Sequence, residues 1–314
     1  MVLYRNLKKM PPGSAIAIGN FDGVHYGHQA LIKQLLVAKD NGANAAYVIL
    51  FEPHPKEYFE AQGQVSRIMS LRDKYDTLAK LGVDAVFCLR FNSQLATQTH
   101  ESFYKDILRF IQPSVFVLGE DFCFGKNRQG DIAYLESKSK LDKFNLDVIK
   151  HKSHKGLRIS SSKIRDVLLN GDLASYKDYT GREYFFSGRV VTGRRLGRRM
   201  GFKTANININ SNKLPLNGVY IVAVSGNKIS RDSYGIANIG YRPTVCNNSL
   251  RRLVEVHIYS HDQDIYGERI AIKFMKKIRD ERKFANIDEL KEQINSDSVF
   301  AKLYLADLTI KTLI

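Results

Sequence analysis

Two histidines lie among three glycines near the N-terminus, in a stretch whose residue types could bind an anion. The stretch runs from Gly19 to His28 as Gly-Asn-Phe-Asp-Gly-Val-His-Tyr-Gly-His, so His25 and His28 are three residues apart. Two neighbouring imidazoles can donate hydrogen bonds to a phosphate group as it gains charge. His-x-x-His could also be half of a metal site, but no spacing of cysteines or carboxylates nearby completes a zinc set. We therefore interpret this stretch as a phosphate-binding site.

The segments on either side are of the kind that would position such a site. Residues 15–18 are Ala-Ile-Ala-Ile, which predicts a short buried strand. After His28, Leu31, Leu35 and Leu36 recur on one face of a helix. Glycines let the backbone approach a ligand, and the first N–H groups of a helix lack partners within it. A strand, a glycine-bearing loop and a helix N-terminus together predict an anion site, although the pattern is neither G-x-G-x-x-G nor a P-loop.

The composition bounds the class of protein. The chain has 314 residues, 44% of them hydrophobic and 25% charged, which is the balance of a soluble protein with room for two domains. No apolar run approaches the roughly 20 residues needed to span a membrane. The three cysteines, Cys88, Cys123 and Cys246, are far apart and odd in number. A reduced, cytoplasmic protein is the simplest prediction.

The chain is strongly basic, with a formal net charge of +16. Such an excess is found in nucleic-acid-binding proteins, but it also suits polyanionic small substrates such as ATP. The one tight basic cluster, at residues 194–199, lies between glycines, which favours nucleotide phosphates. Aromatic residues interleaved with basic ones, the pattern of a nucleic-acid platform, are not evident.

The first half alternates between strand and helix patterns. Residues 15–18, 45–51, 83–89, 115–118 and 146–150 predict strands, and 70–81 and 99–111 predict helices. This alternation indicates a parallel sheet with crossover helices, whose ligands bind beyond the carboxyl ends of the strands. We expect the two prolines of Glu52-Pro-His-Pro55 to prevent a helix from starting there.

Three further polar segments follow these strands, namely 51–55, 119–130 and 159–165. In the second, Lys126 and Arg128 suit phosphates, whereas Phe122 and Phe124 either belong to the core or flank a flat ring. In the third, one of three serines is expected to cap a helix, and hydroxyls beside Arg165 also suit a pyrophosphate. Four polar segments at one sheet edge predict a ligand site.

The second half changes character. Residues 185–191, 219–224, 234–239, 253–259 and 269–274 are short β-prone runs, which predict an antiparallel barrel or sandwich. A helix is predicted from Asn286, with Glu289 reaching back in a capping box. Its apolar stripe is expected to comprise Ile287, Leu290 and Ile294, continued by Phe300, Leu303 and Leu305.

Two features of the second half could carry chemistry. Thr204 and Asn206 follow a glycine-rich basic loop, and their oxygens suit Mg²⁺ bound to ATP phosphates. Glu255 alternates with Val254 and Val256. If those valines are core, Glu255 is either an outward side chain or, where that face lines a pocket, a candidate general base.

Together the motifs resemble bacterial bifunctional riboflavin kinase/FAD synthetases. The first half carries the HxGH signature, F-E-P-H-P, G-x-D-F-x-F-G-x-x-R-x-G and I-S-S-[TS]-x-I-R in order. The second carries G-x-x-x-G-R-x-x-G-F-x-T-A-N, A-N-I-G-x-R-P-T, V-E-V-H and R-D-E-R-K-F. The resemblance covers nearly all of residues 1–180 and 183–307.

This resemblance implies an α/β domain followed by a β domain. Residues 1–182 would form a Rossmann-like HxGH nucleotidyltransferase domain with a parallel sheet that adenylylates FMN to FAD. Residues 183–314 would form a six-stranded Greek-key riboflavin kinase barrel with a C-terminal helix that phosphorylates riboflavin. ATP, riboflavin and FMN would be substrates, with Mg²⁺ as cofactor. We expect no nucleic-acid or membrane partner, and a monomer or weak homo-oligomer.

The resemblance also implies roles for individual residues. His25 and His28 would act on the triphosphate, Ser162 and Arg165 on the leaving pyrophosphate, and Glu255 as the base for the riboflavin 5′-hydroxyl. Thr204 and Asn206 would hold Mg²⁺. The remaining nucleotide- and flavin-binding residues would be Gly19, Asn20, Phe21, Asp22, Gly23, Asp121, Phe122, Phe124, Gly125, Lys126, Arg128, Ser161, Gly193, Gly197, Gly201, Arg279 and Glu281.

Three positions depart from the family pattern: Cys123 stands where Arg is common, Ser162 where Thr is usual, and Lys203 where the family has Pro. Proline fixes φ, so its loss loosens the loop that positions the metal ligands. An FAD synthetase with a weakened kinase half is therefore an alternative within the family. A basic nucleic-acid-binding protein is an alternative of a different class.

Overall fold

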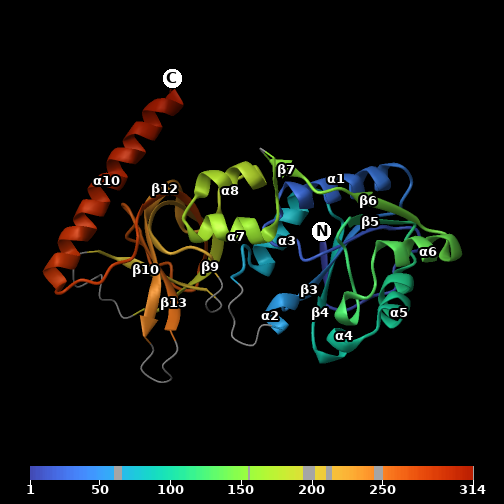
Figure 1. Cartoon of the computed structure of the whole chain (residues 1–314). Helices are drawn as coiled ribbons and strands as arrows, with labels where there is room; N and C mark the ends of the chain where they lie inside the picture. Colours follow the sequence, from blue (N-terminus) through green and yellow to red (C-terminus); the bar gives the residue numbers. More distant parts are fainter. Residues whose placement is uncertain (60–65, 155, 194–201, 210–213, 244–249, 314) are drawn as a thin grey trace. The chain divides into compact units, whose positions relative to one another are not determined.

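The computed structural model describes residues 1–59, 66–154, 156–193, 202–209, 214–243 and 250–313 (Figure 1). The chain divides into two compact units. The first comprises Met1–Val65, Leu71–Ile164 and Tyr179–Gly181, and the second comprises Ser66–Ser70, Arg165–Asp178 and Arg182–Ile314. The predicted domain boundary after Arg182 remains a prediction.

The first unit is built on a parallel sheet, as predicted, but with six strands instead of the five expected. Its strands run in the order β1-β4-β3-β2-β5-β6. Strands β2 and β3 lie at the centre, and every residue of β2 is buried, as expected for a parallel strand covered on both faces. The bounds are β1 Val2–Tyr4, β2 Ala15–Ile18, β3 Ala46–Glu52, β4 Ala85–Arg90, β5 Val115–Gly119 and β6 Asn145–Ile149.

Helices cover both faces of this sheet. Helix α1 (Tyr26–Asp40) packs across β2, β3, β5 and β6 (Figure 1). On the other face, Phe103, Leu108 and Ile111 join Ile16 and Ile18 in one apolar core. These residues come from α5 (His100–Phe103) and the π and 3₁₀ turns Tyr104–Leu108 and Arg109–Ile111 that continue it. The remaining helices are α2 Pro55–Phe59, α3 Leu71–Lys80, α4 Ser93–Thr97 and α6 Ile132–Asp142.

Two details of the first unit differ from the sequence-based expectation. Helix α2 begins at Pro55, so the expectation that the prolines prevent a helix was wrong. Proline is well suited to the first helical position, because the N–H it lacks has no partner there anyway. A hairpin, β7 (Ser153–His154) with β8 (Leu157–Arg158), separates β6 from the serine segment that was expected to follow it.

The serine segment opens a helix, as predicted. Helix α7 (Ser161–Leu169) starts after Ser160, whose Oγ accepts a hydrogen bond from the Lys163 N–H at 3.2 Å. Ser160 is therefore the serine that caps. Helix α8 (Leu173–Thr180) follows.

The second unit is a closed barrel of six antiparallel strands, in the order β10-β13-β12-β11-β14-β9. Five of these strands coincide with the predicted β-prone runs. The sixth, β10, is the Thr-Ala-Asn-Ile-Asn segment, which periodicity alone did not single out. Ala205, Val254 and Val256 fill the barrel interior. The bounds are β9 Phe185–Val191, β10 Thr204–Asn208, β11 Gly218–Gly226, β12 Ile229–Pro243, β13 Leu250–Ile258 and β14 Arg269–Arg279.

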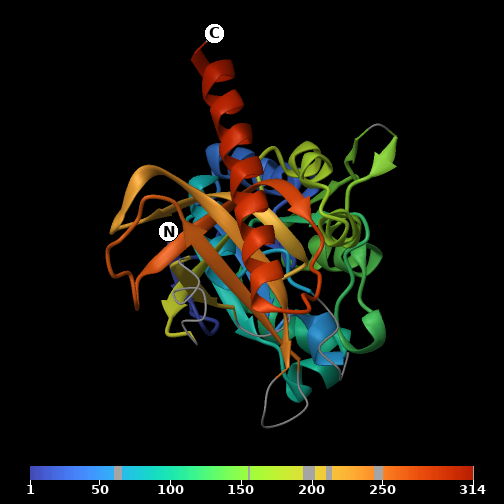
Figure 2. The same ribbon diagram turned by 90° about the vertical axis from the view of Figure 1, so that its left-hand side faces the viewer.

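Helix α10 (Ile287–Leu313) packs across β12 and β14 (Figure 2). Asn286 caps it as predicted, but Glu289 accepts a hydrogen bond from the Ala285 N–H, one residue earlier than a capping box requires. Arg279 fixes the helix to the end of β14 through Asp297, which is 4% exposed, with a shortest Nη2–Oδ2 distance of 2.8 Å.

The predicted apolar stripe of α10 was partly wrong. Ile287 and Leu303 are each 67% exposed, and Phe300 is 47% exposed. The helix instead contacts the barrel through Ala301, which is fully buried, with Tyr304 and Leu305 packed around it. The small side chain of Ala301 lets the helix approach the strands, and a search for large apolar residues overlooks it.

Candidate active sites

A cavity of about 600 Å³ opens at the carboxyl edge of the parallel sheet. It is lined by one residue from the end of each of five neighbouring strands or directly after it: Ile18, Phe51, Phe91, Gly119 and Ile149. The polar segments predicted at this edge also contribute to its wall. The edge is thus a site where segments far apart in the sequence converge on one ligand-sized space.

The two histidines lie in this cavity with their rings stacked, the centroids 3.7 Å apart and the planes at 19°. His25 is the N-cap of α1, and its Nδ1 accepts a hydrogen bond from the His28 N–H at 3.3 Å. Since Nδ1 accepts, the proton of neutral His25 is on Nε2, which makes that nitrogen a donor. A Cβ on Gly27 would lie 3.0 Å from the His25 ring, so the glycine leaves room for this arrangement.

The loop before the histidines divides into lining and supporting residues. Gly19 and Asn20 line the cavity. Phe21 is fully buried and its ring lies 5.1 Å from that of His28. Asp22 is 2% exposed, and its backbone carbonyl accepts a hydrogen bond from Ser161 Oγ at 2.8 Å. Phe21, Asp22 and Gly23 do not line the cavity, so they support the loop that Gly19 and Asn20 present.

An aromatic wall forms another side of the cavity. It consists of Phe51, Phe59, Phe91, Phe103, Phe122 and Phe124. Phe122 and Phe124 are stacked at 5.6 Å, and Phe91 meets Phe59 edge to face at 5.7 Å. Phe59 is 65% exposed, so it is the most solvent-accessible ring of this wall. Only Phe122 and Phe124 were identified from the sequence. Phe51 lies in the F-E-P-H-P motif itself, so it could have been found.

Only some of the residues predicted in the loop after β5 line the cavity. Asp121, Gly125 and Arg128 line the cavity, as does Cys123. Asp121 pairs with Arg158, with Nη2 and Oδ2 2.7 Å apart. Lys126 is exposed and does not line the cavity; its backbone N–H donates to the Gln98 carbonyl at 2.7 Å.

The two residues predicted to hold pyrophosphate are not brought into this cavity. Ser160 and Ser161 line it, but Ser162 is exposed and does not. Arg165 is 9% exposed, and its Nε donates to the Ser66 carbonyl at 2.7 Å. Both partners of that hydrogen bond belong to the second unit.

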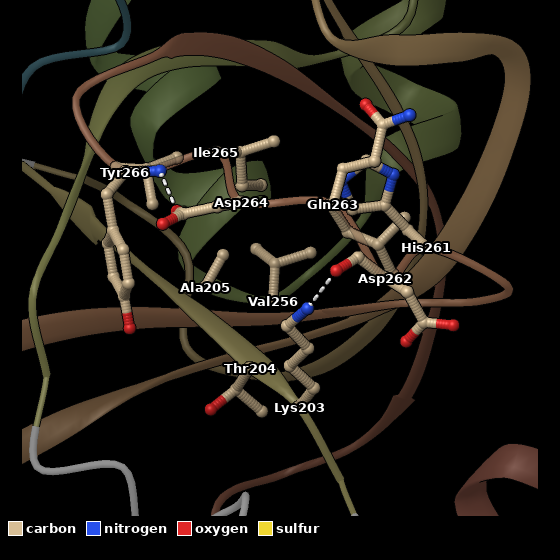
Figure 3. A pocket seen from close by; sticks show the side chains of 12 residues that line it. Lys203, Thr204, Ala205, Val256, His261, Asp262, Gln263, Asp264, Ile265 and Tyr266 are labelled. Atoms are coloured by element: carbon tan, nitrogen blue, oxygen red, sulfur yellow. Dashed lines mark hydrogen bonds between the residues drawn. The ribbon is translucent and has the colours of Figure 1, made fainter.

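A second cavity, of about 230 Å³, lies in the barrel (Figure 3). Ala205, Val256 and Ile258 give it an apolar floor, and Thr204 and the 261–266 segment line its polar side. Lys203 also lines it, and its ammonium donates a hydrogen bond to the Asp262 carbonyl (Figure 3). The Lys203 carbonyl is 2.8 Å from His257 Nδ1. An apolar floor with a charged rim suits a flat base that carries phosphates.

Asn206 and Glu255 lie directly opposite each other on β10 and β13, and Asn238 of β12 is opposite Glu255 on its other side. Val254 and Val256 are fully buried in the barrel, so alternation places Glu255 on the outer face. That face is not simply open to solvent, because Asn206 on it is only 6% exposed. Neither Asn206 nor Glu255 lines the 230 Å³ cavity, whereas Thr204 does.

Asn206 has the features of a metal ligand. Its Oδ1 is buried and has no hydrogen-bond partner among the described residues. Gly193 makes room beside it, since a Cβ there would lie 2.0 Å from Asn206 Nδ2. A hydroxyl and an amide oxygen on one strand face fit Mg²⁺, which prefers oxygen ligands and shares them with phosphates. Within the described residues, no group of three His, Cys, Asp or Glu side chains could hold a metal.

The other predicted residues of the second unit are placed differently. The Arg279 guanidinium is engaged by Asp297, so it serves the α10 contact. Glu281 lies against β12, where a Cβ on Gly240 would be 1.8 Å from its Oε1. Gly197 and Gly201 lie outside the described residues. No helix in the part of the chain that the structure describes is long and apolar enough to cross a bilayer.

Comparison with known proteins identifies two family models along the chain. The FAD synthetase model matches residues 7–163 and the riboflavin kinase model matches residues 180–305. The bifunctional riboflavin kinase/FMN adenylyltransferase of Haemophilus influenzae is 39% identical over 95% of this chain and 96% of its own length. The chain belongs to the bifunctional riboflavin kinase/FMN adenylyltransferase family. It is therefore a transferase with both activities, and the family predicted from the motifs is confirmed.

Other comparisons agree with membership of the bifunctional riboflavin kinase/FMN adenylyltransferases. The member from Escherichia coli K12 is also 39% identical, over 95% of each chain. A crystal structure from Streptococcus pneumoniae, described as a macrolide-efflux protein, matches with a TM-score of 0.80 at 26% identity. It covers 96% of this chain and 98% of that one, so the fold is shared over nearly the full length.

Lys203 is the departure from the family pattern whose effect is most readily measured. We expect Lys203→Pro to raise the KM for ATP in riboflavin phosphorylation about threefold, because it removes a positive charge from the cavity rim. The maximal rate should change little, since Lys203 is not among the residues assigned to the phosphoryl transfer itself. Steady-state assays at varied ATP check this, with Lys203→Met separating the charge from the proline ring. A large gain in rate on Lys203→Pro would instead show that lysine impairs the natural enzyme.

Proposed function

We propose that the 600 Å³ cavity adenylylates FMN and that the outer face of the barrel, with the cavity beside it, phosphorylates riboflavin. The observation that carries the first assignment is that a stacked pair of imidazoles and an aromatic wall line the same space. Imidazoles suit the phosphates of ATP, and a wall of six phenylalanines suits a flat isoalloxazine ring.

In the adenylylation, a phosphate oxygen of FMN attacks the α-phosphorus of ATP. A bond forms between that oxygen and phosphorus, the bond between the α-phosphorus and the bridging oxygen breaks, and pyrophosphate leaves with the electron pair. Nε2–H of His25, with His28 beside it, stabilises the negative charge that develops, while Gly19 and Arg128 surround the phosphates. Positioning supplies most of the remaining acceleration. The pyrophosphate roles of Ser162 and Arg165 stay predictions.

In the phosphorylation, Glu255 takes the proton of the riboflavin 5′-hydroxyl, whose oxygen attacks the γ-phosphorus of ATP, and ADP leaves. The support for this role is that Glu255 stands directly opposite Asn206, the buried candidate metal ligand. Thr204 and Asn206 would hold Mg²⁺, which when bound neutralises phosphate charge. The nucleotide base occupies the apolar floor of the 230 Å³ cavity beside Thr204.

The test of this function uses the whole chain with riboflavin, ATP and Mg²⁺, followed by chromatographic separation of the flavins over time. FMN should appear first and FAD after it, with pyrophosphate released in step with FAD. Accumulation of FMN without FAD would refute the assignment of the first cavity. Conversion of added FMN to FAD, with riboflavin left unchanged, would refute the kinase assignment and favour the alternative of a weakened kinase half.

The aromatic wall yields a prediction of its own. Phe59→Ala should raise the KM for FMN in FAD formation about five- to tenfold, because one ring that covers the flavin is lost. Since Phe59 is already 65% exposed, its removal should leave the fold intact. Initial rates at varied FMN measure the effect. Phe110→Ala is the matched control, because Phe110 is 47% exposed and does not line the cavity.

We also propose that these reactions take place in the cytoplasm, where ATP is available and separated cysteines stay reduced. Of the two cysteines that the structure describes, Cys88 is buried and Cys123 half-buried, and both are free thiols. The protein acts on small molecules, and a monomer or weak homo-oligomer stays our prediction.

A further inference from the structure

Lys74 is an unusually buried charged side chain. It lies on α3 and is only 5% exposed, next to Asp73, which is 2% exposed. Lysines are almost never fully buried unless the ammonium is well paired, because removing it from water is costly. The opposite end of the same helix carries Lys80, which is exposed like most lysines. A buried lysine in the first turns of α3 therefore calls for a specific role.

The ammonium of Lys74 is directed at the backbone of the phosphate loop. Its Nζ donates a hydrogen bond of 2.6 Å to the Asn20 carbonyl. Asn20 lines the 600 Å³ cavity, whereas Lys74 does not, so Lys74 reaches the loop from outside the cavity. Because the peptide unit is planar and trans, fixing the Asn20 carbonyl toward Lys74 turns the N–H of Phe21 away from it. One charged hydrogen bond thus sets the orientation of this peptide.

The backbone after Asn20 has three residues with positive φ, and such a conformation needs support from its surroundings. Phe21 has φ +50°, Gly23 has φ +85° and Val24 has φ +37°. Left-handed conformations are unfavourable for Phe and, still more, for the β-branched Val, and they persist only where the surroundings enforce them. His25 follows immediately as the N-cap of α1. A shift of the Asn20 peptide would therefore be passed on to the histidine pair.

A second observation places Lys74 near strand β4. Burial raises the pKa of the Cys88 thiol on β4 and the Glu52 carboxylate at the end of β3 raises it further, whereas Arg5 and, to a smaller extent, Lys74 lower it. Lys74 is thus close enough to β4 to act on that thiol. Together with the hydrogen bond to the Asn20 carbonyl, this places the ammonium between the loop after β2 and strand β4.

We propose that Lys74 is a positioning residue for FMN adenylylation, one that fixes the Asn20–Phe21 peptide and through it the paired imidazoles. The proposal rests on the proposed function of the 600 Å³ cavity. Lys74 does not touch the reacting atoms. Its loss should therefore reduce the rate through misplacement of the loop, and an error of about 1 Å in such a site can cost on the order of 100-fold.

The test compares Lys74→Met, Lys74→Gln and Lys80→Met in the full chain. Lys74→Met should lower kcat for FAD formation from FMN 10- to 100-fold, with a smaller change in the KM for FMN. Lys74→Gln keeps a donor for the carbonyl and should recover a large part of the loss. Lys80→Met should behave like the natural chain. Riboflavin phosphorylation by the same preparations should stay within twofold throughout.

Each outcome decides the proposal. Normal adenylylation in Lys74→Met would overturn the proposal. An equal loss of both activities in Lys74→Met would also overturn it, because it would mark Lys74 as a merely structural residue. The same conclusion would follow if Lys74→Gln lost as much adenylylation as Lys74→Met. If the unaltered chain makes no FAD from FMN, the proposed function of the cavity itself fails. If the unaltered chain makes FAD and Lys74→Met makes it at the same rate, only the positioning role of Lys74 is refuted.

Discussion

His28→Ala is expected to lower the rate of FAD formation from FMN about 1,000-fold while leaving riboflavin phosphorylation unchanged. The His28 ring lines the cavity and is stacked on His25, so in the proposed mechanism its removal takes away a donor for the charge that develops on the phosphates. Loss of one such preorganised donor typically costs 10²–10³-fold in rate. The measurement is the initial rate of pyrophosphate release with FMN and ATP.

Val37→Ala is the control for this variant, because Val37 lies on the same helix and is 38% exposed. It should retain the full rate. Both variants should unfold cooperatively, and only a small decrease in Tm is expected for His28→Ala, because the loss is limited to the contacts of its ring with Phe21 and His25. Full adenylyltransferase activity in His28→Ala would refute the role assigned to this histidine.

Glu255→Gln should lower riboflavin phosphorylation by a factor of about 10² to 10⁴, the usual contribution of a general base. The amide has nearly the same shape as the carboxylate, so the barrel should fold as before, but it cannot accept the hydroxyl proton. FAD formation from added FMN should not change. The assay follows FMN production from riboflavin with ATP and Mg²⁺.

A matched control is Glu292→Gln, an exposed position on α10 that should leave both activities intact. Near-natural kinase rates in Glu255→Gln, at every pH examined, would mean that Glu255 is simply an outward-facing strand residue. The sequence alone could not decide between these two roles. Alternation with Val254 and Val256 shows on which face of the strand Glu255 lies, but it does not show whether that face binds a substrate.

The central strands of the first unit's sheet, β2, β3 and β4, were predictable because they are almost entirely buried. Such strands are continuous apolar runs, and the helices between them have a distinct period. The edge strand β1, Val2–Tyr4, was missed because three residues are too few to show a pattern. Strand β10 was missed for a different reason, because its Asn206 and Asn208 resemble loop residues. In the closed barrel Asn206 lies on the outer face of the strand and is nevertheless only 6% exposed.

The histidine pair could be predicted because its partners are adjacent in sequence. Stacking of His25 on His28 and the N-cap bond are local consequences of one helix turn. The aromatic wall could not be assembled in this way, because Phe59 comes from α2, Phe91 follows β4 and Phe122 lies in the loop after β5, so they meet only in the folded unit. The hydrogen bond from Arg165 to the Ser66 carbonyl, which spans 99 residues, is equally invisible to local patterns.

The most direct test of two separate sites in one chain is to mix the two variants that each lack one activity. His28→Ala should convert riboflavin only to FMN, and Glu255→Gln should convert only added FMN to FAD. With riboflavin, ATP and Mg²⁺, neither variant alone should yield FAD, whereas an equimolar mixture should yield it after a lag in which FMN accumulates. A mixture that makes FMN but never FAD would contradict the account.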